Sequence, residues 1–196
     1  VDTVAISALA RELSSDAMRG RGPGSRENAN AALRLAVELT GLGARPLYRD
    51  NLIVPFVAPG GSSDNVYNVI GVLPNRSGAV TGDLIGITSH LDHLGVGRPD
   101  ARGDSIYNGF LDAAVPMAMV LDVARRYAHA PGERPLLVMF FNLEEQGLLG
   151  AKALLLRSDI PVAARLKLLI GVDAGSPAGE ALEWQLMGTV PSHAGA

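Results

Sequence analysis

The chain reads Ile87-Thr-Ser-His-Leu-Asp-His-Leu-Gly95 at the end of an apolar run, and two later stretches complete the pattern. These are Gly109-Phe-Leu-Asp112 and Asn142-Leu-Glu-Glu-Gln-Gly147. Together they place imidazole and carboxylate groups where apolar runs end, as expected of strands in a buried sheet. Zinc binds this mixture of nitrogen and oxygen ligands, and a carboxylate can bridge a pair of ions. The first hypothesis is therefore a two-zinc hydrolase.

Length and composition favour a single domain over residues 1–196. A chain of 196 residues with 47% hydrophobic content can bury a substantial core. The formal net charge is -3 and no basic run occurs, so we expect no nucleic-acid partner. No apolar run reaches the roughly 20 residues of a membrane-spanning helix, so we expect no membrane partner. Because the chain has no cysteine, any metal must be held by His, Asp and Glu.

The hydrophobic periodicity predicts alternating helices and strands. Helices are expected over residues 4–18, from the cap at Ser25 to residues 41–43, over 113–128 and over 148–156. Strands are expected over residues 52–57, 66–73, 83–88, 135–141 and 166–172, with a further candidate at 181–187. This order predicts an α/β fold of three layers, α/β/α, with helices on both faces of a mixed, mostly parallel central sheet. The glycine cluster at residues 19–24 follows a helix, so we interpret it as a turn and not as a phosphate-binding loop.

Polar residues follow three of the expected strands closely. His90, Glu144 and Asp173 each come just after an apolar run. Ligands of open α/β sheets bind beyond the carboxyl ends of the strands, so these groups are expected to meet at one rim. Strand ends are also where polar residues return to solvent. The pattern alone therefore fits a metal site and an ordinary solvated rim equally well.

Four blocks, in this order, resemble the co-catalytic zinc exopeptidases of the bacterial leucyl aminopeptidase and aminopeptidase Y type. They are Ser89-His-Leu-Asp-His-Leu-Gly95, Asp104-Ser-Ile-Tyr-Asn-Gly-Phe-Leu-Asp112, Leu143-Glu-Glu-Gln-Gly-Leu-Leu-Gly150 and Ile170-Gly-Val-Asp173. The similarity extends to residues 13–24 and so covers nearly the whole chain. It implies the zinc-exopeptidase fold. Many relatives carry an inserted lid domain where this chain has only a short linker at residues 58–65, so we expect no lid domain. The resemblance also implies an aminopeptidase that hydrolyses N-terminal residues of peptide substrates, in the periplasm or outside the cell.

The resemblance assigns a role to each site residue. It implies that the metal ligands are His90, Asp112, Glu145 and Asp173, with Asp112 bridging two zinc ions. It implies Glu144 as the general base and Asp92 as the carboxylate that supports His90. His93 is expected at the rim. The structural alternatives are a strand-end histidine at His90, a helix N-cap at Asp112, and a solvated acidic pair before a helix at Glu144 and Glu145.

One ligand of the family pattern has no clear counterpart. The family closes its second zinc site with a histidine well downstream of the position of Asp173, and His193 lies too near to be expected in that role. We therefore expect a domain shortened at its carboxyl terminus, lacking its last elements and holding two zinc ions or one. We also expect a partner chain or a second protomer over the exposed sheet edge. Val1 in place of an initiator methionine is interpreted as the start of a processed polypeptide.

Two other functions on the same scaffold stay open. One is a one-zinc acyltransferase that resembles glutaminyl cyclase, and the other is a catalytically inactive binding module. The number of bound zinc ions distinguishes them, because hydrolysis calls for two, the cyclase for one and the module for none. A serine hydrolase is not expected, because the chain has no Gly-x-Ser-x-Gly sequence.

Overall fold

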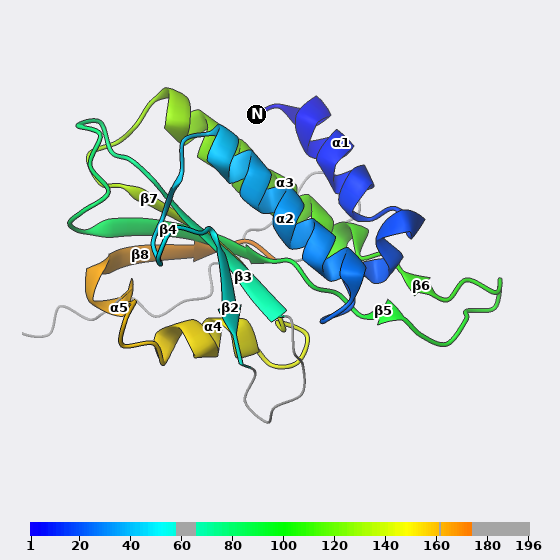
Figure 1. The fold of residues 1–196 in the computed structure, drawn as a ribbon. Helices are drawn as coiled ribbons and strands as arrows, with labels where there is room; N and C mark the ends of the chain where they lie inside the picture. Colours follow the sequence, from blue (N-terminus) through cyan, green and yellow to red (C-terminus); the bar gives the residue numbers. More distant parts are fainter. Residues whose placement is uncertain (58–65, 161, 174–196) are drawn as a thin grey trace, which may run out of the picture.

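A computed structural model of the chain describes residues 1–57, 66–160 and 162–173 (Figure 1). The first half contains α1 (Thr3–Leu13), the 3-10 helix η1 (Asp16–Arg21), α2 (Arg26–Gly41), β1 (Arg45–Pro46), β2 (Ile53–Phe56), β3 (Val66–Leu73), β4 (Leu84–His90) and β5 (Gly95–Val96). The second half contains β6 (Ile106–Tyr107), the π-helical turn η2 (Phe110–Ala114), α3 (Val115–His129), β7 (Leu136–Phe141), α4 (Leu149–Leu155), α5 (Val162–Arg165) and β8 (Leu166–Gly171). Within these ranges, no helix is both long and apolar enough to cross a membrane.

The central sheet is mixed, which confirms the expected fold class. Its strands follow the order β1-β3-β7-β4-β8, and β2 also pairs with β3. β4 runs parallel to both β7 and β8, whereas β3 is antiparallel to β1, β2 and β7. The parallel part is therefore the three-stranded unit β7-β4-β8. Because parallel strands end at the same edge, this unit brings the residues after β4, β7 and β8 together.

Helices cover both faces of the sheet, as the sequence predicts (Figure 1). Val138 and Phe140 of β7 pack into the core with α1, α2 and α3. Leu137 and Met139, which alternate with them, pack into a second core with side chains of the α4 and α5 region. Successive side chains of a strand point to opposite faces, so a strand buried on both faces must be apolar throughout. This explains the continuous apolar run that β7 shows in the sequence.

The N-terminal helix is shorter than expected and is followed by a tight turn. α1 ends at Leu13, and η1 then leads into α2 instead of continuing the helix to residue 18. Gly20 in this turn has a φ of 65°, and a Cβ atom there would lie 2.4 Å from the carbonyl oxygens of Gly95 and Tyr107. Only glycine fits so close an approach of two backbones. The glycine cluster thus closes the chain onto the β5-β6 hairpin, as a turn.

Other boundaries shift near the ends of elements. β4 extends to His90, beyond the expected end at residue 88, and α3 begins at Val115 after the π-helical turn. The expected strand at residues 181–187 lies outside the described residues. Among the described strands β8 pairs with β4 alone, and the side chains of Leu168, Leu169 and Ile170 are about half exposed. A covering partner or second protomer at this edge stays a prediction.

Candidate metal centre

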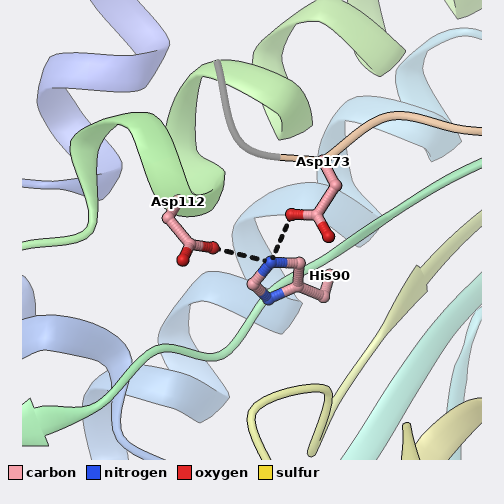
Figure 2. Close-up of side chains that lie close together, drawn as sticks. All are labelled: His90, Asp112 and Asp173. Carbon is pink, nitrogen blue, oxygen red and sulfur yellow. Dashed lines mark hydrogen bonds and ion pairs between the residues drawn. The ribbon is translucent and has the colours of Figure 1, made fainter. Parts of the chain in front are cut away.

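The site forms where the parallel strands end. β4 ends at His90, β7 leads into Glu144 and Glu145, and β8 leads into Asp173. Asp112 comes from the π-helical turn before α3, which lies on one face of the sheet (Figures 1 and 2). Asp112 and Ala113 have non-helical backbone angles in this segment, so the chain bends just before α3 begins. Residues far apart in the sequence therefore converge on one edge.

Three of the expected ligands form a first cluster around His90 (Figure 2). His90 Nε2 lies 2.9 Å from Asp112 Oδ1 and 3.2 Å from Asp173 Oδ1. Ligand atoms around a tetrahedral zinc lie about 3.3 Å apart, given its usual bond lengths. The His90 side chain is only 3% exposed, whereas the two carboxylates are more open to solvent. Donor types and spacing therefore fit a zinc ion with one side left open to substrate.

His93, Asp112 and Glu145 form a second cluster. Nδ1 of His93 lies 2.5 Å from Oε1 of Glu145, and their side chains are 12% and 20% exposed. His93, which was expected at the rim, therefore lies beside Glu145 within the acidic site. His93 directly follows the His90-Leu-Asp92 segment, and this proximity was the signal in the sequence that it could join the site. Sequence spacing alone does not show in which direction its side chain points. Asp112 belongs to both clusters, as a carboxylate shared by two metal ions would.

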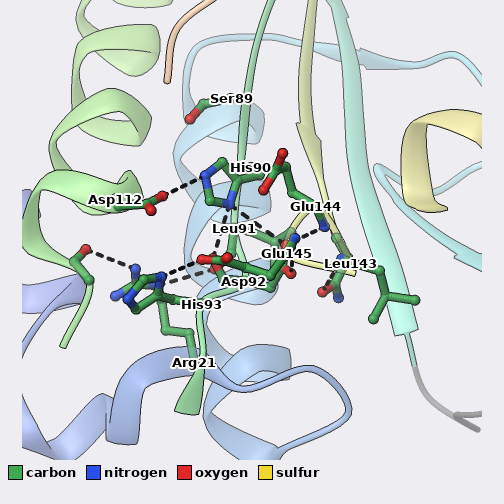
Figure 3. Close-up of polar contacts among 12 residues, drawn as sticks. Arg21, Ser89, His90, Leu91, Asp92, His93, Asp112, Leu143, Glu144 and Glu145 are labelled. Carbon is green, nitrogen blue, oxygen red and sulfur yellow. Dashed lines mark hydrogen bonds and ion pairs between the residues drawn. The ribbon is translucent and has the colours of Figure 1, made fainter. Parts of the chain in front are cut away.

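Asp92 connects the histidine strand to the Glu-Glu segment (Figure 3). Its buried carboxylate accepts hydrogen bonds from the backbone N–H groups of Glu144 and Glu145, at 3.1 and 3.4 Å. The nearest acceptor for His90 Nδ1 is the Asp92 carbonyl oxygen at 3.1 Å, with the carboxylate at 3.8 Å. A histidine that donates from Nδ1 keeps the Nε2 lone pair for a metal. Asp92 thus orients His90 through its carbonyl group and the Glu-Glu segment through its carboxylate.

The structural alternatives for the acidic residues fit less well. The N-cap of α3 is Ala114 and not Asp112. Glu145 contacts His93 and is not a freely solvated carboxylate. The N-cap and solvated-pair interpretations therefore do not account for these side chains. His90 does have a backbone partner at Nδ1, but Nε2 faces two carboxylates.

Glu144 lies beside the first cluster with an altered acidity. Burial raises the pKa of Glu144, nearby His90 lowers it, and the carboxylates of Asp173, Glu145 and Asp92 raise it further. The net shift is upward. A carboxylate whose pKa moves toward neutrality is a better proton acceptor for catalysis at ordinary pH. Glu144 also borders a cavity of about 150 Å³ together with His90, Asp173 and several apolar side chains.

Metal binding should weaken as the pH falls. Burial lowers the pKa of His90, but the carboxylates of Asp92, Asp173 and Glu144 outweigh it and raise the pKa to about 9. A metal binds the neutral imidazole, so below this pH it must displace a proton. The zinc dissociation constant should rise roughly tenfold for each pH unit of acidification in this range. Chelator competition at about pH 8 and about pH 6 measures it; equal affinities at both would contradict this ligand assignment.

Solved structures of known proteins share the fold of this chain. The chain resembles a leucine aminopeptidase precursor from Bacteroides thetaiotaomicron, with a TM-score of 0.67, 16% identity, and coverage of 88% of this chain and 62% of that one. A Bacteroides thetaiotaomicron glutaminyl cyclase bound to N-acetylhistamine gives the same values. LapB from Legionella pneumophila has a TM-score of 0.65 and 22% identity, and the match covers 89% of this chain and 43% of that one. No curated protein sequence matches significantly.

The chain thus spans less than two thirds of the length of these solved structures, and at such identities they show the fold alone. The sequence match is more specific. The family model described as Peptidase family M28 matches residues 68–195. This range makes up most of the chain and includes every residue of the two clusters. The chain therefore belongs to peptidase family M28.

Proposed function

We propose that the protein is an aminopeptidase whose catalytic centre binds two zinc ions. The observation that carries this proposal is the position of Asp112, which belongs both to the cluster with His90 and Asp173 and to the cluster with Glu145. A carboxylate shared in this way can hold two ions in one site. His90, Asp112 and Asp173 would hold the first ion, and His93, Asp112 and Glu145 would hold the second. Family membership and the fold shared with the leucine aminopeptidase precursor support the assignment.

The chemistry follows from the groups around the clusters. Bound zinc supplies Lewis-acid activation of water and of the scissile carbonyl group. Glu144, whose pKa is raised mainly by burial, accepts the proton of the attacking water and delivers it to the leaving amine. Asp92 holds the backbone of Glu144 through its carboxylate, so the base is fixed relative to His90. The residues that orient the base and the residues that would hold zinc thus lie at the same edge of the sheet.

The surroundings favour a substrate with a free amino terminus. The centre collects the carboxylates of Asp92, Asp112, Glu144, Glu145 and Asp173 at one edge of the sheet. Carboxylate oxygens that hold no metal can accept hydrogen bonds from an α-ammonium group, even where bound zinc offsets most of the negative charge. The neighbouring cavity is lined in part by apolar side chains, which suits an apolar N-terminal residue; they are Phe141, Leu148 and Val172.

Activity on a free amino terminus tests the proposal. The protein should release p-nitroaniline from leucine p-nitroanilide but not from the N-acetylated compound, because acetylation removes the positive charge. A chelator should abolish the reaction, and added zinc should restore it. Hydrolysis of both compounds, or activity that survives complete removal of metal, would contradict the aminopeptidase assignment.

A second function is favoured by one observation. The glutaminyl cyclase structure matches this fold as well as the leucine aminopeptidase precursor does. A peptide with an N-terminal glutamine separates the two reactions: cyclisation releases ammonia and leaves pyroglutamate on the peptide, whereas hydrolysis releases free glutamine. A protein that binds peptide but no zinc and gives neither product would instead be a binding module.

A further inference from the structure

Arg21 is buried beneath the metal centre, and within residues 1–57, 66–160 and 162–173 its hydrogen-bond acceptors include no carboxylate (Figure 3). Its side chain is fully buried. Burial lowers the pKa of Arg21 to about 10, while the charges of Asp92, Asp112 and Glu145 oppose that shift. The guanidinium therefore remains charged at neutral pH. Buried charges are costly and usually have an ionic partner, so this one calls for an explanation.

Backbone carbonyl groups from three separate segments accept its hydrogen bonds. Nε donates to Leu91 at 3.1 Å, Nη1 donates to Leu13 at 2.5 Å and to Asn108 at 2.9 Å, and Nη2 donates to Gly109 at 3.0 Å. The planar fork of donors in arginine suits such a fixed arrangement of acceptors, and lysine cannot reproduce it.

Two of these segments carry metal-centre residues. Leu91 stands directly between His90 and Asp92. Gly109 precedes the π-helical turn that contains Asp112. One guanidinium therefore joins the segment of His90 to the segment of Asp112, whose ligand atoms lie 2.9 Å apart.

The backbone of Arg21 extends the same connection. Its carbonyl oxygen accepts hydrogen bonds from Asn28 Nδ2 at 3.0 Å and from the N–H of His93 at 3.4 Å. The Asn28 side chain is in turn hydrogen-bonded to Asn142, two residues before Glu144. Arg21 adopts a φ of 48°, a conformation that non-glycine residues rarely adopt. An uncommon backbone conformation and a buried charge thus coincide at the residue that contacts the ligand-bearing segments.

We propose that Arg21 is a positioning residue that sets the separation of His90 and Asp112 and so preforms the metal centre. The proposal rests on the metal binding proposed above. It adds that a residue before the family-matched range of 68–195 determines metal affinity. The electrostatic effect of Arg21 has the opposite sign, because a fixed positive charge repels an incoming cation. Geometry and charge can therefore be separated experimentally.

Two substitutions make this separation. Arg21→Lys keeps the charge but loses the fork of donors, whereas Arg21→Met loses both. Arg34→Lys and Arg34→Met are matched controls, because Arg34 forms ion pairs with Glu12 and Glu38 at the surface. For each protein, circular dichroism measures the folded fraction, chelator competition measures the zinc dissociation constant of folded protein, and the visible spectrum of bound Co²⁺ reports coordination geometry.

We expect Arg21→Lys to fold, to bind zinc about 10- to 100-fold more weakly, and to show an altered Co²⁺ spectrum, while both Arg34 variants match the wild type. If Arg21 served only the fold, the folded variants would bind metal like the wild type. If only its charge mattered, Arg21→Lys would be unchanged and Arg21→Met would bind more tightly. Either result overturns the proposal, and Arg21→Lys alone decides it if Arg21→Met fails to fold. Wild-type protein that binds no zinc would instead refute the proposed function.

Discussion

Replacing Glu144 with glutamine should lower kcat about 10²- to 10⁴-fold, the usual contribution of a general base. The substitution keeps the size of the side chain but removes its ability to accept a proton. Glu144 belongs to neither of the two potential ligand clusters, so the zinc content should not change. Steady-state kinetics on leucine p-nitroanilide, with metal analysis of the same sample, measures both quantities.

The matched control is Glu133→Gln, since the Glu133 side chain is 85% exposed and lies in a surface ion pair with Arg76. This variant should retain wild-type kcat. A Glu144→Gln protein with near-normal kcat would remove Glu144 from the mechanism. A variant that had also lost its zinc would show that Glu144 acts in metal binding, and the kinetic loss could then not be attributed to proton transfer.

Replacing Asp112 with alanine should remove both zinc ions, and activity with them. The residue lies in both clusters, so its loss leaves His90 with Asp173 on one side and His93 with Glu145 on the other. Neither pair supplies the three protein ligands usual for a catalytic zinc site. We expect zinc content to fall from two per chain to none after equilibration and removal of free metal, measured by elemental analysis.

Asp50→Ala is the control for this experiment, because Asp50 is an exposed aspartate of the same chain. It should keep both ions. Retention of one ion in Asp112→Ala would mean that one cluster binds metal independently and that Asp112 is not a bridge. Retention of both would place the metal ions elsewhere in the protein.

The sequence predicted the parts of the site that depend on strand ends. His90, Glu144 and Asp173 follow apolar runs that form β4, β7 and β8, and these strands are parallel neighbours. Parallel strands with buried faces leave a strong apolar signal, and their carboxyl ends must meet. The convergence of the residues that follow them could therefore be inferred without coordinates. Their roles as ligands or as a base came from the family resemblance and await the measurements above.

The features that the sequence analysis missed arise from contacts between residues far apart in the sequence or from irregular backbone. The contact between the His93 imidazole and Glu145 was not expected. Arg21 lay in a segment interpreted as a simple turn, because nothing in its local sequence shows that carbonyl groups far along the chain meet its guanidinium. The π-helical turn at Phe110–Ala114 was also missed, since helical periodicity does not distinguish it from the start of α3. Side-chain direction and irregular turns are set by tertiary packing, which local patterns do not encode.

The most direct test of the central claim is a zinc-edge anomalous diffraction map of the zinc-loaded protein. We expect two anomalous peaks on either side of the Asp112 carboxylate, about 3.5 to 4 Å apart as in other two-metal sites. One peak should lie against His90 and Asp173, and the other against Glu145. A single peak, or two peaks that do not share Asp112, would contradict the claim that this residue bridges two metal ions.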